Sequence, residues 1–107
     1  MITGNVANES NAPYDYFALA GTIDANSEAL LREIPAKVKH GQVRFDFTHA
    51  GRINSMGIAL LLRCFKEIQG RAEIRLEGMS PMQTMLFKMT GVFLLAKPVE
   101  PGKEGSV

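Results

Sequence analysis

The residue pair Asn54-Ser55 stands directly before an apolar run, and its position suggests chemistry. Either side chain can accept a hydrogen bond from the first turn of a following helix, which stabilises the helix by about 1 kcal/mol. The free N–H groups and the positive end of the helix dipole also favour an anion at this position. Ser55 is therefore either a simple helix cap or the carrier of a phosphate that its own helix would accommodate.

The residues that follow Ser55 bear on the second interpretation. A phosphate would add roughly −1.5 to −2 charges at a loop-to-helix corner. If this corner is a binding surface, the phosphate would abolish binding without unfolding the protein. Met56 precedes the apolar stripe of the predicted helix, and we expect its side chain to be exposed. Gly57 has no side chain, which would let the backbone of a partner come close.

Other kinds of chemistry lack their residues. His40 and His49 lie in predicted loops, and neither has a second ligand at metal-binding spacing. A hydrolase elbow would need glycines on both sides of its serine, but here Ser55 lies between Asn54 and Met56. No segment has the lysine and glycine spacing of a nucleotide-binding loop. We therefore expect neither an enzyme nor a metal or cofactor.

Composition points to one compact domain with a protein or small-molecule partner. The 107 residues are 46% hydrophobic, and 12 basic and 11 acidic residues give a net charge of +1. This balance predicts no nucleic-acid or anionic-membrane footprint. No apolar stretch approaches the ~20 residues that span a bilayer. The lone Cys64, predicted to be a semi-buried filler, and the lack of a signal-peptide pattern predict a cytoplasmic protein.

Strand-like alternation and helical periodicity follow one another along the first half. Residues 16–21, "YFALAG", and residues 42–47, "QVRFDF", are predicted strands. Asp24 or Asn26 is a candidate cap for a helix between them, and Pro35 predicts that this helix ends or kinks one residue earlier. Its expected apolar face consists of Leu30, Leu31, Ile34 and Val38.

The middle of the chain is predicted to be loop, helix and strand. Residues 48–54, "THAGRIN", are polar and are predicted to form a loop. Residues 56–69 have helical periodicity, Gly70 ends the helix, and residues 72–78 form a strand. The stripe that this helix turns inward consists of Ile58, Leu61, Leu62, Phe65 and Ile68.

Ser80-Pro81 predicts the start of a third helix, because serine caps well and proline loses nothing at the first helical position. Gly91 is a candidate left-handed helix end, and residues 92–96, "VFLLA", are a predicted strand. The apolar residues at helical spacing between these ends are predicted to pack in the core, in preference to binding a partner. They are Met82, Met85, Leu86 and Met89.

This alternation implies parallel strands joined by right-handed crossovers, and hence an α/β fold with helices packed on the sheet. The ordered region is expected to be residues 14–97, with an edge strand near residues 2–7. We therefore assign one domain to residues 1–97 and a flexible tail to residues 98–107.

The order "GTID", "VRFDFT", "INSMGIALLL", "IRLEGMSPMQTMLFKMTG" resembles a STAS domain of the anti-sigma factor antagonist group over about residues 17–95. The resemblance implies the STAS fold, a mixed, mostly parallel sheet of four to five strands with helices on one face. An antiparallel edge strand would use residues 2–7. The most specific parts of the resemblance are the junction at residue 55 and six later positions, Gly78, Pro81, Leu86, Phe87, Thr90 and Gly91.

The resemblance implies recognition in place of catalysis. In this family the unphosphorylated domain binds a serine/threonine-kinase-type anti-sigma factor and so frees a sigma factor. The kinase phosphorylates one serine to break the complex, and a metal-dependent serine phosphatase restores it. The family's Asp-Ser-Ser-Gly junction corresponds to Asn54, Ser55, Met56 and Gly57, which makes Ser55 the implied phosphoacceptor.

Further family positions extend the implied partner site. Asp24 matches a loop that lies near the acceptor, and Thr48 falls where some relatives carry a second modifiable hydroxyl. Asn54 removes a negative charge beside the acceptor, and Met56 leaves Ser55 as the junction's single serine. Two alternatives stay open, namely a STAS subunit of a lipid-transport ABC system and a nucleotide or small-ligand sensor. The expected state is a monomer or a weak dimer.

Overall fold

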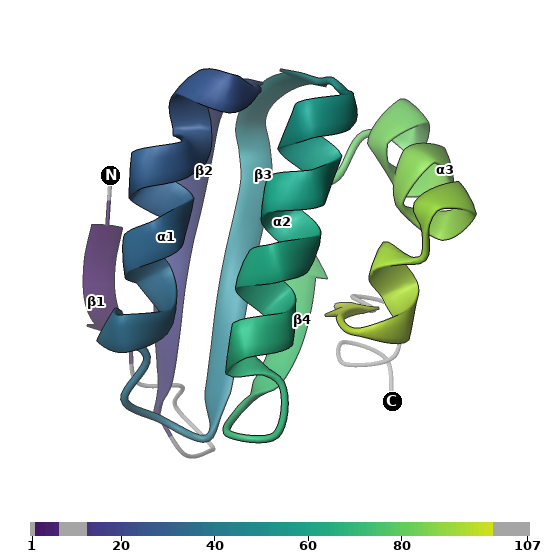
Figure 1. Cartoon of the computed structure of the whole chain (residues 1–107). Helices are drawn as coiled ribbons and strands as arrows, with labels where there is room; N and C mark the ends of the chain where they lie inside the picture. The colour runs from purple at the N-terminus through teal and green to yellow at the C-terminus, as the bar shows by residue number, and fades with distance from the viewer. Residues whose placement is uncertain (1, 7–12, 100–107) are drawn as a thin grey trace.

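The computed structural model describes residues 2–6 and 13–99, so Ala7 and residues 100–107 of the predicted tail lie outside the described residues. Helices cover one face of a five-stranded sheet (Figure 1). The elements are β1 (Ile2–Val6), β2 (Tyr14–Ile23), η1 (Ala25–Ser27), α1 (Glu28–Lys37), β3 (Gln42–Ile53), α2 (Ser55–Ile68), β4 (Glu73–Glu77), α3 (Pro81–Thr90), η2 (Val92–Leu94) and β5 (Lys97–Pro98).

The spatial order of the strands is their order in the sequence, β1-β2-β3-β4-β5. Strands β2 to β5 are mutually parallel, and β1 pairs antiparallel with β2. Because parallel crossovers are right-handed and the sheet grows in one direction, the crossover helices fall on the same face. Figure 1 shows α1 and α2 side by side across β2 and β3, with α3 apart beyond β4. The predicted mixed α/β sheet and its antiparallel edge strand are confirmed.

Aromatic side chains of the central strands fill the space between sheet and helices. The ring of Phe45 lies 5.7 Å from that of Phe17 and 5.0 Å from that of Phe65 on α2. Full burial of such a side chain is worth about 1.5–3 kcal/mol. Cys64 lies in the same layer, and burial raises the pKa of its thiol to about 12. Cys64 is thus more deeply buried than the predicted semi-buried filler, and a thiol with this pKa stays protonated at neutral pH.

The expected loop over residues 48–54 is wrong. Strand β3 continues to Ile53, where it pairs with Ile23 at the end of β2. The prediction rested on local polarity, but the backbone of this segment is paired with β2 although most of its side chains face water. The extension of β3 carries the chain directly to Asn54 and the start of α2.

Helix α1 also departs from the prediction. It passes through Pro35 and ends at Lys37, and Leu30 of the expected apolar face is 41% exposed. Proline removes only one helical hydrogen bond here, near the end of the helix, and its ring is buried together with Leu31 and Ile34. Packing therefore outweighs the local cost of proline.

The predicted strand at residues 92–96 is wrong as well. Gly91 has a φ of 88° and ends α3 as predicted, but Val92–Leu94 then forms the 3₁₀ helix η2. The N–H of Ala96 donates to the Val92 carbonyl at 3.0 Å, and both side chains are buried. This short turn lets the chain reverse beside α3, and only Lys97–Pro98 pairs with β4.

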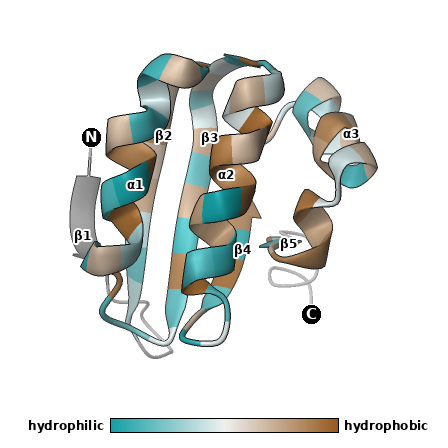
Figure 2. Cartoon of the chain, in the orientation of Figure 1, coloured by the Kyte–Doolittle hydropathy of each residue, from teal (hydrophilic) through white to brown (hydrophobic). Residues whose placement is uncertain are grey.

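The methionines of α3 do not pack in the core, contrary to the prediction. Met82, Met85 and Met89 are 81%, 61% and 76% exposed. The helix stands beyond β4, and it buries only Gln83 and Phe87. Phe87 anchors it, with its ring 5.2 Å from that of Phe47. Figure 2 shows hydrophobic colour on parts of α3 and on η2.

Candidate functional site

The N-terminus of α2 is capped by Asn54. Its side-chain Oδ1 accepts a hydrogen bond from the Gly57 N–H at 2.8 Å, and its own N–H donates to the Ile23 carbonyl at 3.3 Å. Ser55 is therefore the first helical residue and not the cap. Asn54 has the extended backbone of a cap and accepts the capping hydrogen bond, so the Ser55 hydroxyl is not needed for it.

Ser55 is exposed, and within the described residues its hydroxyl makes no hydrogen bond. The next residue, Met56, is 50% exposed, as predicted. The first N–H groups of a helix have no partner within the helix and point along its axis, so they favour negative charge beside Ser55. The junction thus presents a free hydroxyl and an apolar side chain together at the positive end of α2.

Gly57 has a different role from the one expected. A Cβ atom at this position would lie 2.1 Å from the carbonyl oxygen of Ile23 and 2.8 Å from its carbon. Gly57 is buried, and the backbone that comes close is the end of β2. The residue therefore seats α2 against β2 and does not receive a partner.

The Asp24 turn lies beside this junction. Asp24 follows Ile23 directly, and its side chain accepts a hydrogen bond from the Asn26 N–H at 2.9 Å while Ser27 completes the capping box of η1. The Ile23 carbonyl contacts both the Asn54 cap and the first turn of α2. The Asp24 turn, which follows Ile23, is therefore held next to Ser55. The structure brings Asp24, Asn54, Ser55 and Met56 to one corner.

Thr48 lies outside that corner. Four residues of β3 lie between it and Ile53, so the two are five steps, or about 16 Å, apart along the strand. Its hydroxyl donates to Oδ1 of Asp46 at 2.6 Å, and its N–H donates to the same oxygen at 2.9 Å. The Thr48 hydroxyl is therefore engaged, unlike that of Ser55.

Asp46 joins two strands on the uncovered face of the sheet. Its other carboxylate oxygen accepts a hydrogen bond from the Tyr16 hydroxyl of β2. Partial burial would raise the pKa of the Asp46 carboxyl, but the hydrogen bonds from Thr48 and Tyr16 outweigh it and lower that pKa. The hydrogen bond to Asp46, with partial burial, raises the pKa of Tyr16 to about 12. The pair thus fastens β2 to β3 while Tyr16 is neutral and Asp46 is ionised.

This pairing predicts a pH dependence at the alkaline end. The raised pKa of Tyr16 contributes stability that is complete below pH 10.0 and is lost as the pH rises toward about 12. We expect the free energy of unfolding to fall less steeply over this range in Tyr16→Phe than in the wild type, as measured by urea denaturation at several pH values. Tyr14→Phe is the matched control, and an unchanged slope in Tyr16→Phe would contradict the assignment.

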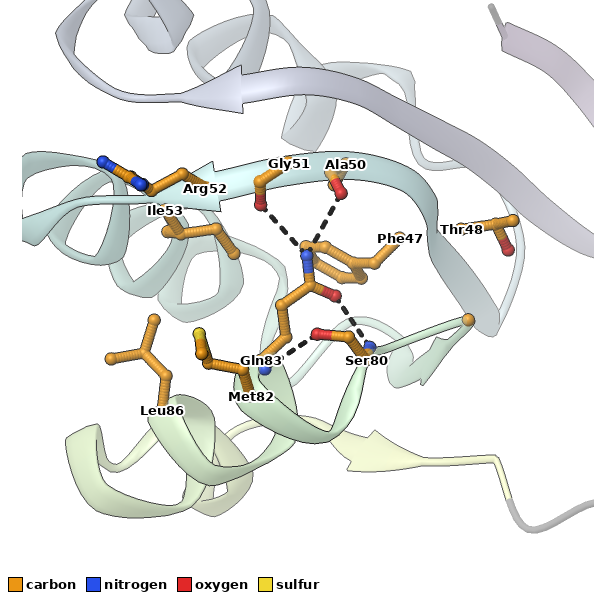
Figure 3. A pocket seen from close by; sticks show the side chains of 11 residues that line it. Phe47, Thr48, Ala50, Gly51, Arg52, Ile53, Ser80, Met82, Gln83 and Leu86 are labelled. Carbon is orange, nitrogen blue, oxygen red and sulfur yellow. Dashed lines mark hydrogen bonds between the residues drawn. The ribbon is translucent and has the colours of Figure 1, made fainter.

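A groove lies between β3 and α3 that the sequence did not predict. It has a volume of about 520 Å³ and forms where β3 continues past the end of β4. Gln83 lies at its centre, and its amide donates to the carbonyls of Ala50 and Gly51 at 3.2 and 3.1 Å (Figure 3). Its lining consists of Phe47, Thr48, Ala50, Gly51, Arg52, Ile53, Gly78, Ser80, Met82, Gln83 and Leu86.

One signal in the sequence pointed to this groove. Gln83 occupies the buried stripe of α3, where an apolar residue would be the default. A buried amide needs partners, and the open edge of β3 supplies them. Only the pairing of strands shows that this edge is open, so the sequence alone leaves the groove invisible.

Neither a metal-binding group nor a membrane-spanning helix is found among the described residues. Within residues 13–99, histidine, cysteine and carboxylate side chains form no group of three or more that could hold a metal ion. None of the helices in this part of the chain has the length and hydropathy needed to cross a membrane.

Comparison with known proteins supports the mixed α/β fold described above. The family model described as the STAS domain matches residues 15–102. The solved structure of the anti-sigma factor antagonist SpoIIAA in its unphosphorylated form is similar, with a TM-score of 0.64 and 17% sequence identity. The match covers 83% of this chain and 82% of that chain. Among curated proteins no match is found.

Proposed function

Because the chain belongs to the STAS domain family, we propose that it is an anti-sigma factor antagonist, a protein-binding switch controlled by phosphorylation. In the proposed cycle the unphosphorylated form binds a serine/threonine-kinase-type anti-sigma factor in the cytoplasm. The kinase transfers a phosphate to Ser55, and a metal-dependent serine phosphatase removes it. The chain itself acts by binding and not as an enzyme.

The observation that carries this proposal is the uncommitted hydroxyl of Ser55. Asn54 takes over the capping hydrogen bond, so a phosphate on Ser55 would break no contact of the folded chain. The positive end of α2 would stabilise that phosphate. Its charge would change the surface next to Met56 and the Asp24 turn, where the partner is proposed to bind. The chain shares its fold with the anti-sigma factor antagonist SpoIIAA, which fits the proposed class of protein.

A kinase assay with two matched serines tests the acceptor. Ser55 and Ser80 are both exposed and both lie at a helix start, but the Ser80 hydroxyl accepts a hydrogen bond from the Gln83 N–H at 3.0 Å. We expect a kinase encoded beside the gene, with ATP and magnesium, to phosphorylate the wild type and Ser80→Ala at Ser55. We expect no incorporation in Ser55→Ala, as measured by mass spectrometry of peptides.

The two variants also separate loss of the acceptor from loss of the fold. Ser80→Ala removes a cap and should lower the free energy of unfolding by about 1 kcal/mol, whereas Ser55→Ala should leave it nearly unchanged. Phosphate found on Ser80, on Thr48 or on no residue would refute the assignment of Ser55.

A further inference from the structure

Four exposed apolar side chains form what we call the methionine face. Met82, Met85 and Met89 follow one another at helical spacing on α3, and Leu94 of η2 comes after them with 81% exposure. Exposed apolar side chains are ordinary when single, but a contiguous group marks an interaction surface. Methionine is flexible and polarisable, which suits it to contact with another protein.

The groove between β3 and α3 continues this face inward. Met82 belongs to both, and the groove walls add Phe47, Ile53 and Leu86. In Figure 3 the Gln83 amide donates hydrogen bonds to the Ala50 and Gly51 carbonyls of the inner wall. These carbonyls are therefore not available to pair with an added strand. A helix whose apolar side chains enter the groove fits this geometry better than an extended peptide.

The two segments that form most of this surface carry charged side chains of one sign. Residues 47–54 and 78–98, which form the groove and the methionine face, contain no aspartate or glutamate. Their charged side chains, Arg52, Lys88 and Lys97, are all exposed. Asp46 lies at the Thr48 and Gly78 end of the groove, where its carboxylate accepts hydrogen bonds from Thr48 and Tyr16. The cationic part of the surface is therefore the part around Arg52 and Lys88. Complementarity therefore favours an acidic partner.

We propose that the methionine face and its groove bind an acidic amphipathic helix of a protein partner, and this inference rests on the proposed function. Glutamates or aspartates of that helix would meet Arg52 and Lys88, and its apolar residues would cover Met82 and Met85. A second copy of this chain would oppose cation to cation. An anionic membrane is the poorer fit, because membrane-binding segments commonly carry four to eight clustered cations and this surface has three.

The same surface explains how phosphorylation would act on the partner. Ser55 follows Ile53 of the groove wall by two residues, a backbone distance of at most about 7 Å. This is within the Debye length of about 8 Å at physiological salt. A phosphate on Ser55 would therefore repel an acidic helix in the groove directly, without a change of fold.

A pair of synthetic peptides tests the proposal on the full chain. One 18-residue helical peptide carries leucines on one face and glutamates elsewhere, and in the other every glutamate is replaced by lysine. We expect the acidic peptide to shift the NMR signals of Met82, Met85, Met89 and residues 47–53, and to bind at least tenfold more tightly than the lysine peptide. The triple variant Met82→Gln, Met85→Gln, Met89→Gln should bind it at least tenfold more weakly than the wild type.

Leu30→Gln on α1 is the matched control, since Leu30 is also an exposed apolar residue but lies away from α3, and it should leave binding unchanged. Equal binding of the two peptides, or signal shifts elsewhere, would overturn the proposal. So would a dimer lost in the triple variant, or binding of this face to phosphatidylglycerol vesicles in place of the acidic peptide. Peptide binding without phosphorylation of Ser55 would refute the switch alone. Phosphorylation of Ser55 without peptide binding would refute the acidic helix alone.

Discussion

Replacing Gly57 with alanine is expected to lower the free energy of unfolding by about 3 kcal/mol, the upper part of the range for overpacked sites. The new methyl group would lie 2.1 Å from the Ile23 carbonyl oxygen, and this atom belongs to the backbone and cannot turn aside. Helix propensity alone predicts the opposite sign, since alanine is favoured over glycine within a helix by about 1 kcal/mol. Urea denaturation followed by circular dichroism measures the difference.

Gly41→Ala provides the control for this substitution. A Cβ atom at Gly41 would meet nothing within 4 Å, and its φ does not lie in the left-handed region. We expect Gly41→Ala to be neutral or to stabilise by up to about 1 kcal/mol, because it restricts the unfolded chain. If Gly57→Ala is as stable as the wild type, the seating of α2 on β2 is wrong, and with it the placement of Ser55.

Ser55→Asp is expected to weaken the proposed kinase complex about 100-fold, or ~3 kcal/mol, as measured by calorimetry. The added carboxylate stands beside the methionine face and the Asp24 turn, so it places negative charge where the partner binds. The same carboxylate lies in the first turn of α2, where an acidic side chain stabilises a helix by about 0.3–1 kcal/mol. Binding should therefore be lost while the free energy of unfolding is unchanged or higher.

Ser55→Asn separates charge from size. Asparagine has nearly the same volume as aspartate without its charge, so it should retain most of the affinity. Equal loss in Ser55→Asn and Ser55→Asp would show that shape governs the junction, and full retention of binding by Ser55→Asp would contradict an electrostatic switch. The predictions at Gly57 and Ser55 are independent, because the first tests the seating of the helix and the second tests its exposed corner.

Local sequence signals were sufficient where the physics is local. Ser80-Pro81 and Gly91 bound α3 as predicted, because capping and left-handed backbone depend on a few neighbouring atoms. The alternation of Val43, Phe45 and Phe47 likewise predicted the central part of β3 and its buried face. Resemblance to the STAS family added the implied role of Ser55 as the phosphoacceptor.

Predictions failed where strands or helices far apart in the sequence decide the outcome. Residues 48–53 are mostly small or polar but become strand because β2 lies beside them. The methionines of α3 have the spacing of a core stripe but remain exposed, because β4 ends at Glu77 and leaves no sheet beneath that side of the helix. Periodicity shows that a helix has an apolar face, and only the neighbouring layers determine whether that face is covered.

The junction shows the same division on the scale of single residues. By itself the sequence determined a helix starting near residue 55, a hydroxyl at its first turn and an exposed methionine beside it, because these follow from local spacing. Only the tertiary structure decided that Asn54 is the cap, that Gly57 belongs to the contact with β2, and that the Ser55 hydroxyl is free. The reason is physical: a cap and a close approach are set by the strand that ends against the helix, and that strand lies some thirty residues earlier in the chain.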